Sequence, residues 1–150
     1  MTPLIRQATV DDAAAISDLA SELGYPSVAE VMRNRLMTLL GRSDHLVLVA
    51  VNDNAAVHGW IQAHVSDLLE SGQRVDIVGL VVAQRARRTG SGRLLVEQVE
   101  LWARALGCDV VAVCSNVKRV ESHLFYPAMG YKNVKTQVSY RKWLKSGDAF

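Results

Sequence analysis

Hydrophobic positions along the chain follow two spacings, one typical of helices and one typical of strands. Between residues 9 and 24, apolar side chains recur every three or four positions, which predicts an amphipathic helix. Thr9 and Asp12 match a capping box at its start, and Gly24 is suited to end it. The same spacing predicts a helix over residues 26–41, a long one over 94–106 and a short one around 120–125.

Seven shorter stretches are rich in valine, isoleucine and leucine, which predicts strands. The stretch 110–114 is almost wholly apolar, as expected for a central strand covered on both faces. Asn52 and Asn54 mark a turn between two of the strands and predict a hairpin there. The predicted strands cover residues 4–9, 45–51, 57–65, 75–83, 110–114, 131–135 and 138–144.

The order of these elements is β, α, α, β, β, β, α, β, α, β, β, which predicts a mixed α/β protein. A chain of 150 residues is long enough to bury one hydrophobic core. No repeat, linker or low-complexity segment interrupts the pattern. The sequence therefore predicts a single domain over residues 1–150.

Composition narrows the class of protein. The hydrophobic fraction is 49% and the charged fraction 21%, as in soluble globular proteins. The net charge of +2 is too balanced to indicate nucleic-acid binding, and no apolar run approaches the about 18 residues that span a membrane. The first residues do not resemble a secretion signal, so we expect a cytoplasmic protein. Cys108 and Cys114 flank an apolar strand and are expected to be reduced and buried.

The sequence LVVAQRARRTGSGRLL, at residues 80–95, carries the most chemical information. It predicts a strand, a loop with two glycines and the start of a helix. Free N–H groups at a helix N-terminus attract anions, and the helix dipole adds about half a positive charge. Gly90 and Gly92 let the backbone approach an anion, while Arg87 and Arg88 add charge. The segment is suited to a pyrophosphate, and a plain turn with solvated arginines is the alternative.

Two other phosphate-binding motifs match the chain poorly. The nucleotide-hydrolase loop requires GxxxxGK followed by Ser or Thr, and the chain has no such run. The dinucleotide-binding fold requires GxGxxG directly after the first strand, whereas Leu95 stands at the third glycine position and the unit lies in mid-chain. A nucleotide-binding domain of either kind is therefore disfavoured.

The loop instead resembles the coenzyme A loop of the GNAT N-acetyltransferase superfamily, because Arg87, Gly90 and Gly92 match its spacing. The resemblance covers roughly residues 4–144 in element order. It implies a GNAT-like α/β fold with a mixed, mostly antiparallel central sheet of about seven strands, flanked by about four helices. It also implies acetyl-CoA as co-substrate, with the strand before the loop pairing with the pantetheine arm. The cofactor contacts implied are Leu80, Val81, Val82, Arg87, Arg88, Thr89, Gly90, Ser91, Gly92 and Arg93.

A second segment, residues 115–131, resembles the family pattern that runs from an asparagine to FYxxxGY. By this match, Asn116 hydrogen-bonds to pantetheine and Tyr126 protonates the departing thiolate. A phenol stays protonated at neutral pH and can donate to sulfur, and His123 is a further candidate for proton transfer. Pro127 departs from the pattern and is expected to push Tyr126 out of helical geometry. A purely structural role for both candidates is the alternative.

In much of that family, a glutamate on the strand before the loop acts as the general base, often through water. Asp76 falls at that place, one methylene shorter, at the start of an apolar strand. A carboxylate in such surroundings is suited to accept a proton, whereas a solvent-facing aspartate is the alternative. Glu70 is a second, weaker candidate. The four histidines and two cysteines lack metal-ligand spacing, so no metal is expected.

Together, the patterns and the resemblance predict an N-acetyltransferase that moves an acetyl group from acetyl-CoA to a primary amine by direct attack. The alternative is a non-catalytic acyl-CoA-binding module with the same fold. In the resembling family, the first two helices and the last loop shape the acceptor pocket, here residues 21–35 and 133–137. Glu22, Tyr25 and Glu30 are candidate contacts to a cationic amine. The acceptor is either a small-molecule amine or a peptide N-terminus or lysine, and a homodimer is compatible with the resemblance.

Overall fold

The computed structural model describes residues 2–22, 24–114 and 120–145. The chain divides into two compact units, Met1–Cys114 and Ser115–Phe150, and the expectation of one domain stays a prediction. In the described residues, no helix is long and apolar enough to cross a membrane. The second unit contains α4 (Val120–Ala128). The first unit contains β1 (Leu4–Gln7), the 3-10 helix η1 (Val10–Asp12), α1 (Ala13–Glu22), α2 (Ala29–Leu40), β2 (His45–Val51), β3 (Val57–Leu68), β4 (Gly72–Val82), the 3-10 helix η2 (Gln84–Ala86), α3 (Ser91–Ala105) and β5 (Val111–Val113).

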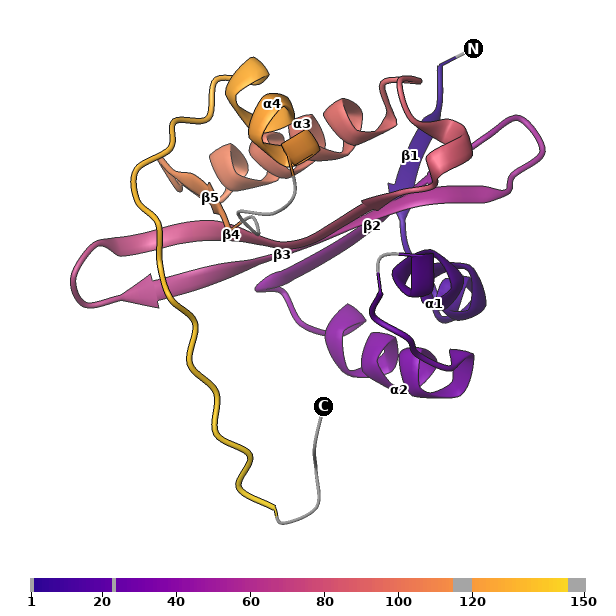
Figure 1. The fold of residues 1–150 in the computed structure, drawn as a ribbon, viewed down its shortest axis with the longest axis horizontal. Helices are drawn as coiled ribbons and strands as arrows, with labels where there is room; N and C mark the ends of the chain where they lie inside the picture. The colour runs from indigo at the N-terminus through magenta and orange to yellow at the C-terminus, as the bar shows by residue number, and fades with distance from the viewer. Residues whose placement is uncertain (1, 23, 115–119, 146–150) are drawn as a thin grey trace. The chain divides into compact units, whose positions relative to one another are not determined.

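The first unit is built on a five-stranded sheet in the order β1-β2-β3-β4-β5 (Figure 1). Strands β1 to β4 pair antiparallel, whereas β5 runs parallel to β4. The helical crossover between β4 and β5 is what a parallel pair requires, because two parallel strands cannot be joined by a tight turn. The mixed, mostly antiparallel sheet implied by the resemblance is therefore confirmed.

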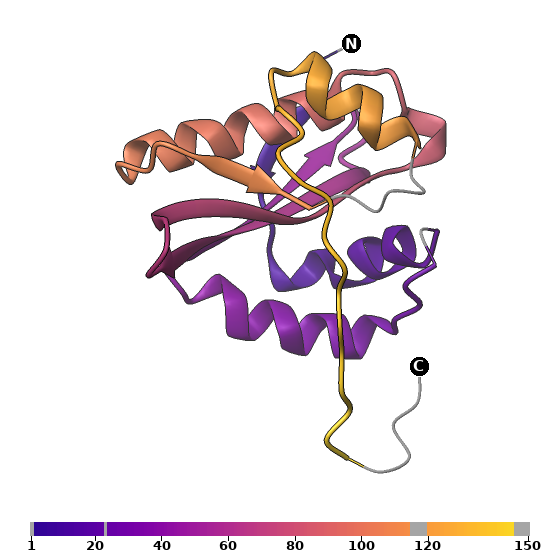
Figure 2. The same cartoon turned by 60° about the vertical axis from the view of Figure 1, so that its left-hand side comes forward.

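Helices cover both faces of this sheet, with α3 on one face and α1 and α2 on the other (Figures 1 and 2). Leu95 and Val99 of α3 are fully buried. Ile16 of α1 and Leu36 of α2 are nearly so. The run of buried residues in β2 reflects cover on both faces of the strand. Burying one such aliphatic side chain contributes about 1.5–3 kcal/mol, so the two apolar helix layers hold the sheet in place.

The start of the first helical region is tied to β1 by a buried carboxylate. Asp12 accepts hydrogen bonds from both terminal nitrogens of Arg6, at 2.8 and 2.9 Å, and from the backbone N–H of Thr9 at 2.8 Å. The hydrogen bonds from Arg6 lower the pKa of Asp12, against the opposing effect of burial. The capping box predicted at Thr9 and Asp12 is confirmed. The capping box lies at the 3-10 helix η1, which directly precedes α1.

Two expectations about the sheet and its surroundings are wrong. The sheet has five strands in the described residues, not about seven, because residues 131–145 form neither strand nor helix. Apolar alternation gives a segment strand tendency, but a strand also requires a neighbour that satisfies its N–H and C=O groups. Cys108 is buried as expected, whereas Cys114, just after the end of β5, is exposed, and both are free thiols.

Candidate functional site

Strands β4 and β5 separate partway along their length. In the described residues they pair at three positions, from Val75 opposite Val111 to Ile77 opposite Val113. β4 then continues to Val82, paired with β3 alone among the described residues. Backbone N–H and C=O groups on the open side of residues 78–82 therefore have no strand partner there, and such groups require water or a ligand. The predicted pantetheine contacts Leu80, Val81 and Val82 lie in this stretch.

A β-bulge lies at the point of separation. Ile77 pairs with Ala63 and Gly79 with Gln62, so Val78 has no partner in β3 and its side chain is 52% exposed. A bulge bends its strand and increases the local twist, which carries β4 away from β5. Gly79 follows the bulge, and a Cβ at this position would lie 2.8 Å from two ring carbons of Trp60. Glycine is needed here because the Trp60 ring occupies the space of a side chain.

The open edge of β4 leads directly into the predicted phosphate loop. The chain passes through η2, and Gly90 then caps α3 with a left-handed backbone at φ +87°. Arg88 is also left-handed, at φ +68°, a conformation that costs a non-glycine residue about 1–2 kcal/mol. Apart from its chain neighbours, no atom of the described residues lies within 4 Å of a Cβ placed at Gly90. The first N–H groups of α3 have no acceptor within the helix, so they can bind an anion.

The loop side chains divide into two groups. Arg88 is exposed, and Arg93 forms an ion pair with Glu97 at 3.3 Å on the surface of α3. Ser91 is fully buried, and its hydroxyl lies 2.8 Å from the Thr89 hydroxyl. The Thr89 hydroxyl donates to the Ala86 carbonyl at 2.6 Å. The hydroxyls of Thr89 and Ser91 therefore hold the loop together.

One buried partner of the loop was not predicted from the sequence. The Nε2 atom of His58, in β3, lies 2.6 Å from the Ser91 hydroxyl oxygen, and both residues are buried. Burial lowers the pKa of His58, and the charge of Arg85 acts in the same direction, while the Ala56 backbone opposes both. A single histidine in a strand carries no sequence signal for such a contact, because the contact joins residues far apart in the chain.

Asp76, the candidate base, lies one position before the last pair that joins β4 to β5. Its two carboxylate oxygens accept hydrogen bonds, one from the Ser66 hydroxyl and one from Nε of Arg74 at 3.0 Å. His64 is its partner across the strands, and the Asp76 side chain is 18% exposed. Each carboxylate oxygen has two lone pairs, so the hydrogen bonds from Ser66 and Arg74 leave Asp76 able to accept from a further proton donor. Glu70 is exposed, outside strands β3 and β4.

The candidate acid lies in the second unit. Tyr126 is half-buried in α4, with its ring 5.0 Å from that of Phe125 and 5.7 Å from that of Tyr131. The expectation that Pro127 displaces Tyr126 from the helix is wrong, because α4 continues through Pro127 to Ala128. Proline lacks one N–H donor, and near the end of a helix that loss disrupts little of it.

Two other predicted residues belong to this unit. His123 is exposed in α4, and Asn116 lies outside the described residues. Placement of Tyr126, His123 and Asn116 beside β4 stays a prediction, because β4 belongs to the other unit.

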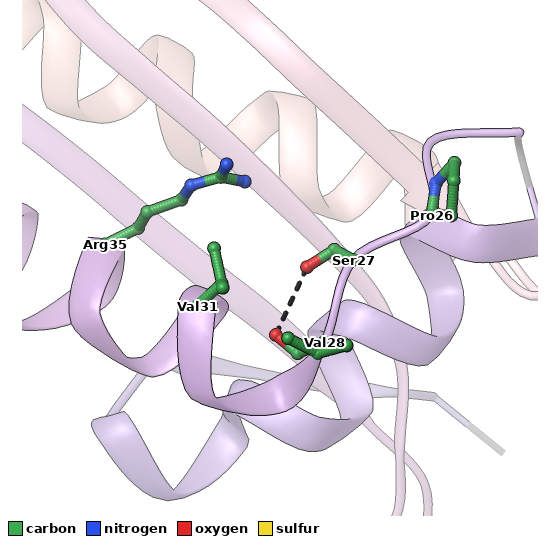
Figure 3. Close-up of a pocket in the computed structure, with 5 residues that line it drawn as sticks. All are labelled: Pro26, Ser27, Val28, Val31 and Arg35. Atoms are coloured by element: carbon green, nitrogen blue, oxygen red, sulfur yellow. Dashed lines mark hydrogen bonds between the residues drawn. The ribbon is translucent and has the colours of Figure 1, made fainter. Parts of the chain in front are cut away.

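A hollow lies beside the start of α2, within the segment predicted to shape an acceptor site. Figure 3 shows its lining, with the Arg35 side chain reaching over Val31. The Ser27 hydroxyl donates to the Val28 carbonyl at 3.3 Å. None of the predicted acceptor contacts Glu22, Tyr25 and Glu30 lines it. The lining residues are Pro26, Ser27, Val28, Val31 and Arg35.

No group of three or more histidine, cysteine or acidic residues in the described ranges could hold a metal ion. The open edge of β4 and the loop after it offer backbone donors and acceptors, a carboxylate and a helix N-terminus. This set is suited to bind an extended chain that ends in a phosphate group.

Known proteins resemble the chain in sequence and in fold. The sequence model described as "Acetyltransferase (GNAT) family" matches residues 13–131. An aminoglycoside N(6')-acetyltransferase type 1 of Stenotrophomonas maltophilia is 28% identical over 143 residues, which cover 93% of this chain and 92% of that protein. An uncharacterised N-acetyltransferase of Bacillus subtilis is 27% identical over 111 residues, or 74% of this chain and 75% of that one.

Among solved structures, an aminoglycoside antibiotic 6'-N-acetyltransferase of Acinetobacter baumannii superposes with a TM-score of 0.82 at 22% identity. The superposition covers 95% of this chain and 99% of that one. A protein described as a transcriptional regulator, from Bacillus halodurans, gives a TM-score of 0.86 at 19% identity, over 93% of this chain and 99% of that one. At these identities the superpositions establish the fold alone.

Proposed function

The chain belongs to the acetyltransferase (GNAT) family and is an acyltransferase, and from this premise we propose that it acetylates a primary amine on a small molecule, with acetyl-CoA as donor. The observation that carries the proposal is the continuity of the binding surface. The open edge of β4, the loop and the N-terminus of α3 follow one another without interruption. An extended ligand with a pyrophosphate at one end matches that order of groups.

We assign the parts of acetyl-CoA to this surface in order. The pyrophosphate binds the backbone N–H groups at residues 87–93, where the α3 dipole and the arginines favour negative charge. The amides of the pantetheine arm pair with the open edge of Leu80, Val81 and Val82, as an added strand would. The thioester then lies near the bulge at Val78, where β4 and β5 separate.

The reaction needs one proton removed and one supplied. An ammonium acceptor first loses a proton to Asp76, directly or through a water molecule, since the nitrogen lone pair must be free to attack. The new C–N bond forms as the C–S bond breaks, and the electron pair leaves on the coenzyme A sulfur. Tyr126 donates its phenolic proton to that thiolate, and His123 is a further route for protons. The amine nitrogen releases its second proton to solvent.

A small-molecule acceptor is supported by two observations. Relatives that align over most of the chain are named for acetylation of aminoglycosides, which are small polyamines. The hollow beside α2, in the segment expected to shape the acceptor site, is bordered by short side chains and one arginine. A peptide N-terminus or lysine is the competing acceptor class.

A thiol-release assay with a panel of amines tests the proposal. The purified chain and acetyl-CoA are incubated with aminoglycosides, linear polyamines, amino acids and lysine-containing peptides, and free coenzyme A is measured with a thiol reagent. Amine-dependent release is expected, strongest with small-molecule amines. Release with peptides alone would overturn the acceptor class. Binding of acetyl-CoA without release for any amine would favour the non-catalytic module.

The acid is tested in the same assay with one substitution and a matched control. Tyr126→Phe is expected to lower kcat about 10²-fold or more, the usual range for general acid catalysis, with little change in affinity for acetyl-CoA. Tyr140→Phe is the control, because Tyr140 is 90% exposed in the same unit. An unchanged kcat in Tyr126→Phe would remove Tyr126 as the acid.

A further inference from the structure

His58 is turned toward α3 by an irregularity in the strand pairing. Ala50 pairs with Gly59 and Val51 with Val57, so His58 has no partner in β2. An extra residue of this kind re-aims side chains in its strand. The neighbours Val57 and Trp60 pack with Leu19 of α1 on one side of the sheet, whereas the His58 imidazole reaches Ser91, the first residue of α3, on the other.

The direction of each hydrogen bond follows from counting protons. The Thr89 hydroxyl has one proton, and it is used on the Ala86 carbonyl at 2.6 Å. The 2.8 Å contact between Thr89 and Ser91 then requires the Ser91 hydroxyl to donate. The 2.6 Å contact between Ser91 and His58 therefore requires Nε2–H to donate to the Ser91 oxygen. The Nδ1 atom has no partner within hydrogen-bonding geometry among the described residues.

The resulting chain of hydrogen bonds holds the loop on both sides of Gly90. It runs from the His58 ring through the Ser91 and Thr89 hydroxyls to the Ala86 carbonyl at the end of η2. Burial lowers the pKa of His58, which disfavours a positive charge on the ring behind the loop.

We propose that His58 is a positioning residue for the pyrophosphate loop, which it holds in its anion-binding conformation through Ser91 and Thr89. The inference rests on the proposed function, since it assumes that the loop binds the pyrophosphate of acetyl-CoA. His58 itself does not touch the ligand, because the Ser91 and Thr89 hydroxyls separate its ring from the far end of the hydrogen-bond series. Its effect is therefore confined to ligands that carry the pyrophosphate.

The experiment compares two acetyl donors in His58→Leu and His58→Gln. Acetyl-CoA contains the pyrophosphate, whereas S-acetylpantetheine contains the same thioester and arm without it. His58→Leu removes the donor and is expected to raise the KM for acetyl-CoA about five- to tenfold, the effect of one lost hydrogen bond, with kcat changed less than about twofold. The kcat/KM for S-acetylpantetheine is expected to stay unchanged. His58→Gln keeps an N–H donor and is expected to recover most of the loss.

Other results overturn the inference. An equal loss of kcat/KM with both donors would mean that His58 supports the fold in general rather than the loop. An unchanged KM for acetyl-CoA in a folded His58→Leu would also reject it. If thermal unfolding shows that His58→Leu is not folded, Ser91→Ala takes its place. This substitution interrupts the same series of hydrogen bonds at the Ser91 hydroxyl. Failure of the wild-type chain to bind acetyl-CoA would instead reject the proposed function, so the two failures are distinct.

The assigned tautomer gives a second, independent readout. A long-range proton–nitrogen correlation spectrum of the labelled wild-type chain reports which imidazole nitrogen carries the proton. A proton is expected on Nε2 of His58. An Nε2 atom without a proton would reverse the direction of the Ser91 hydrogen bond and contradict the arrangement proposed.

Discussion

The two ends of α3 allow the role of Gly90 in binding to be separated from its role in folding. Gly90 precedes the helix at φ +87°, and Gly107 follows it at φ +81°. Within the part of the chain that the structure describes, only chain neighbours lie within 4 Å of a Cβ placed at either position. Substitution by alanine therefore has the same backbone cost at both ends and adds no clash at either. Only Gly90 lies in the loop assigned to the pyrophosphate.

The cost follows from the backbone geometry. An alanine held in the left-handed region costs about 1–2 kcal/mol, so Gly107→Ala is expected to unfold more easily by that amount. For a chain of this size, the change lowers Tm by about 2–8 °C. In the free Gly90→Ala variant the loop relaxes part of this strain, so the loss of stability is smaller, and binding must then restore the strained conformation. The relaxed part of the energy appears in binding instead, as an increase in Kd for acetyl-CoA of up to about five- to thirtyfold.

Calorimetric titration and thermal unfolding of both variants measure the two effects. Gly90→Ala is expected to lose stability and affinity, whereas Gly107→Ala is expected to lose stability and keep the wild-type Kd. Equal Kd values in all three proteins would refute the assignment of the loop to the pyrophosphate. Equal weakening in both variants would show that affinity follows global stability rather than the geometry of Gly90.

Three further predictions follow from other contacts. Arg87→Glu is expected to raise the Kd for acetyl-CoA about tenfold, because it places a negative charge beside the pyrophosphate. Titration at two salt concentrations measures the change, and an unchanged Kd would contradict the prediction. Gly79→Ala is expected to lower the free energy of unfolding by about 1–3 kcal/mol, because the new Cβ displaces the Trp60 ring. Thermal unfolding and tryptophan emission measure this effect, and an unaltered emission and Tm would reject the contact. Because the pKa of Asp12 is lowered, its carboxylate is expected to stabilise the fold above about pH 4, and this stabilisation is lost as pH falls through the folded pKa. Asp12→Asn should flatten the pH dependence of stability in acid unfolding, and an unchanged slope would argue against the Arg6 contact.

The features that the sequence predicted well are those encoded by neighbouring residues. The strand His45–Val51 was predicted with its observed bounds, because an unbroken apolar run is buried on both faces. The helix after Gly90 was predicted from its apolar spacing and from the glycines before it. Such signals need only the local periodicity of the chain, and they are sufficient to place the loop between β4 and α3, whose binding of a phosphate stays a prediction.

The features that could not be predicted depend on distant partners. Apolar alternation after Tyr131 favours strands, yet no described strand pairs with residues 131–145. The bulge that turns His58 toward Ser91 depends on the register between β2 and β3, which no local pattern reveals. The Ser66 hydroxyl also reaches Asp76 through the pairing of β3 with β4, whereas Arg74 lies two residues away on the same strand. Register and pairing are properties of the folded sheet rather than of any short segment.

Calorimetric titration of the full chain with acetyl-CoA tests the central claim most directly, with NAD and ATP as comparison ligands. The assignment of the β4 edge and the loop predicts binding of acetyl-CoA in the micromolar range, with no comparable affinity for NAD or ATP. Absence of heat with acetyl-CoA, or equal affinity for all three ligands, would contradict the claim that this surface recognises the pantetheine arm together with the pyrophosphate.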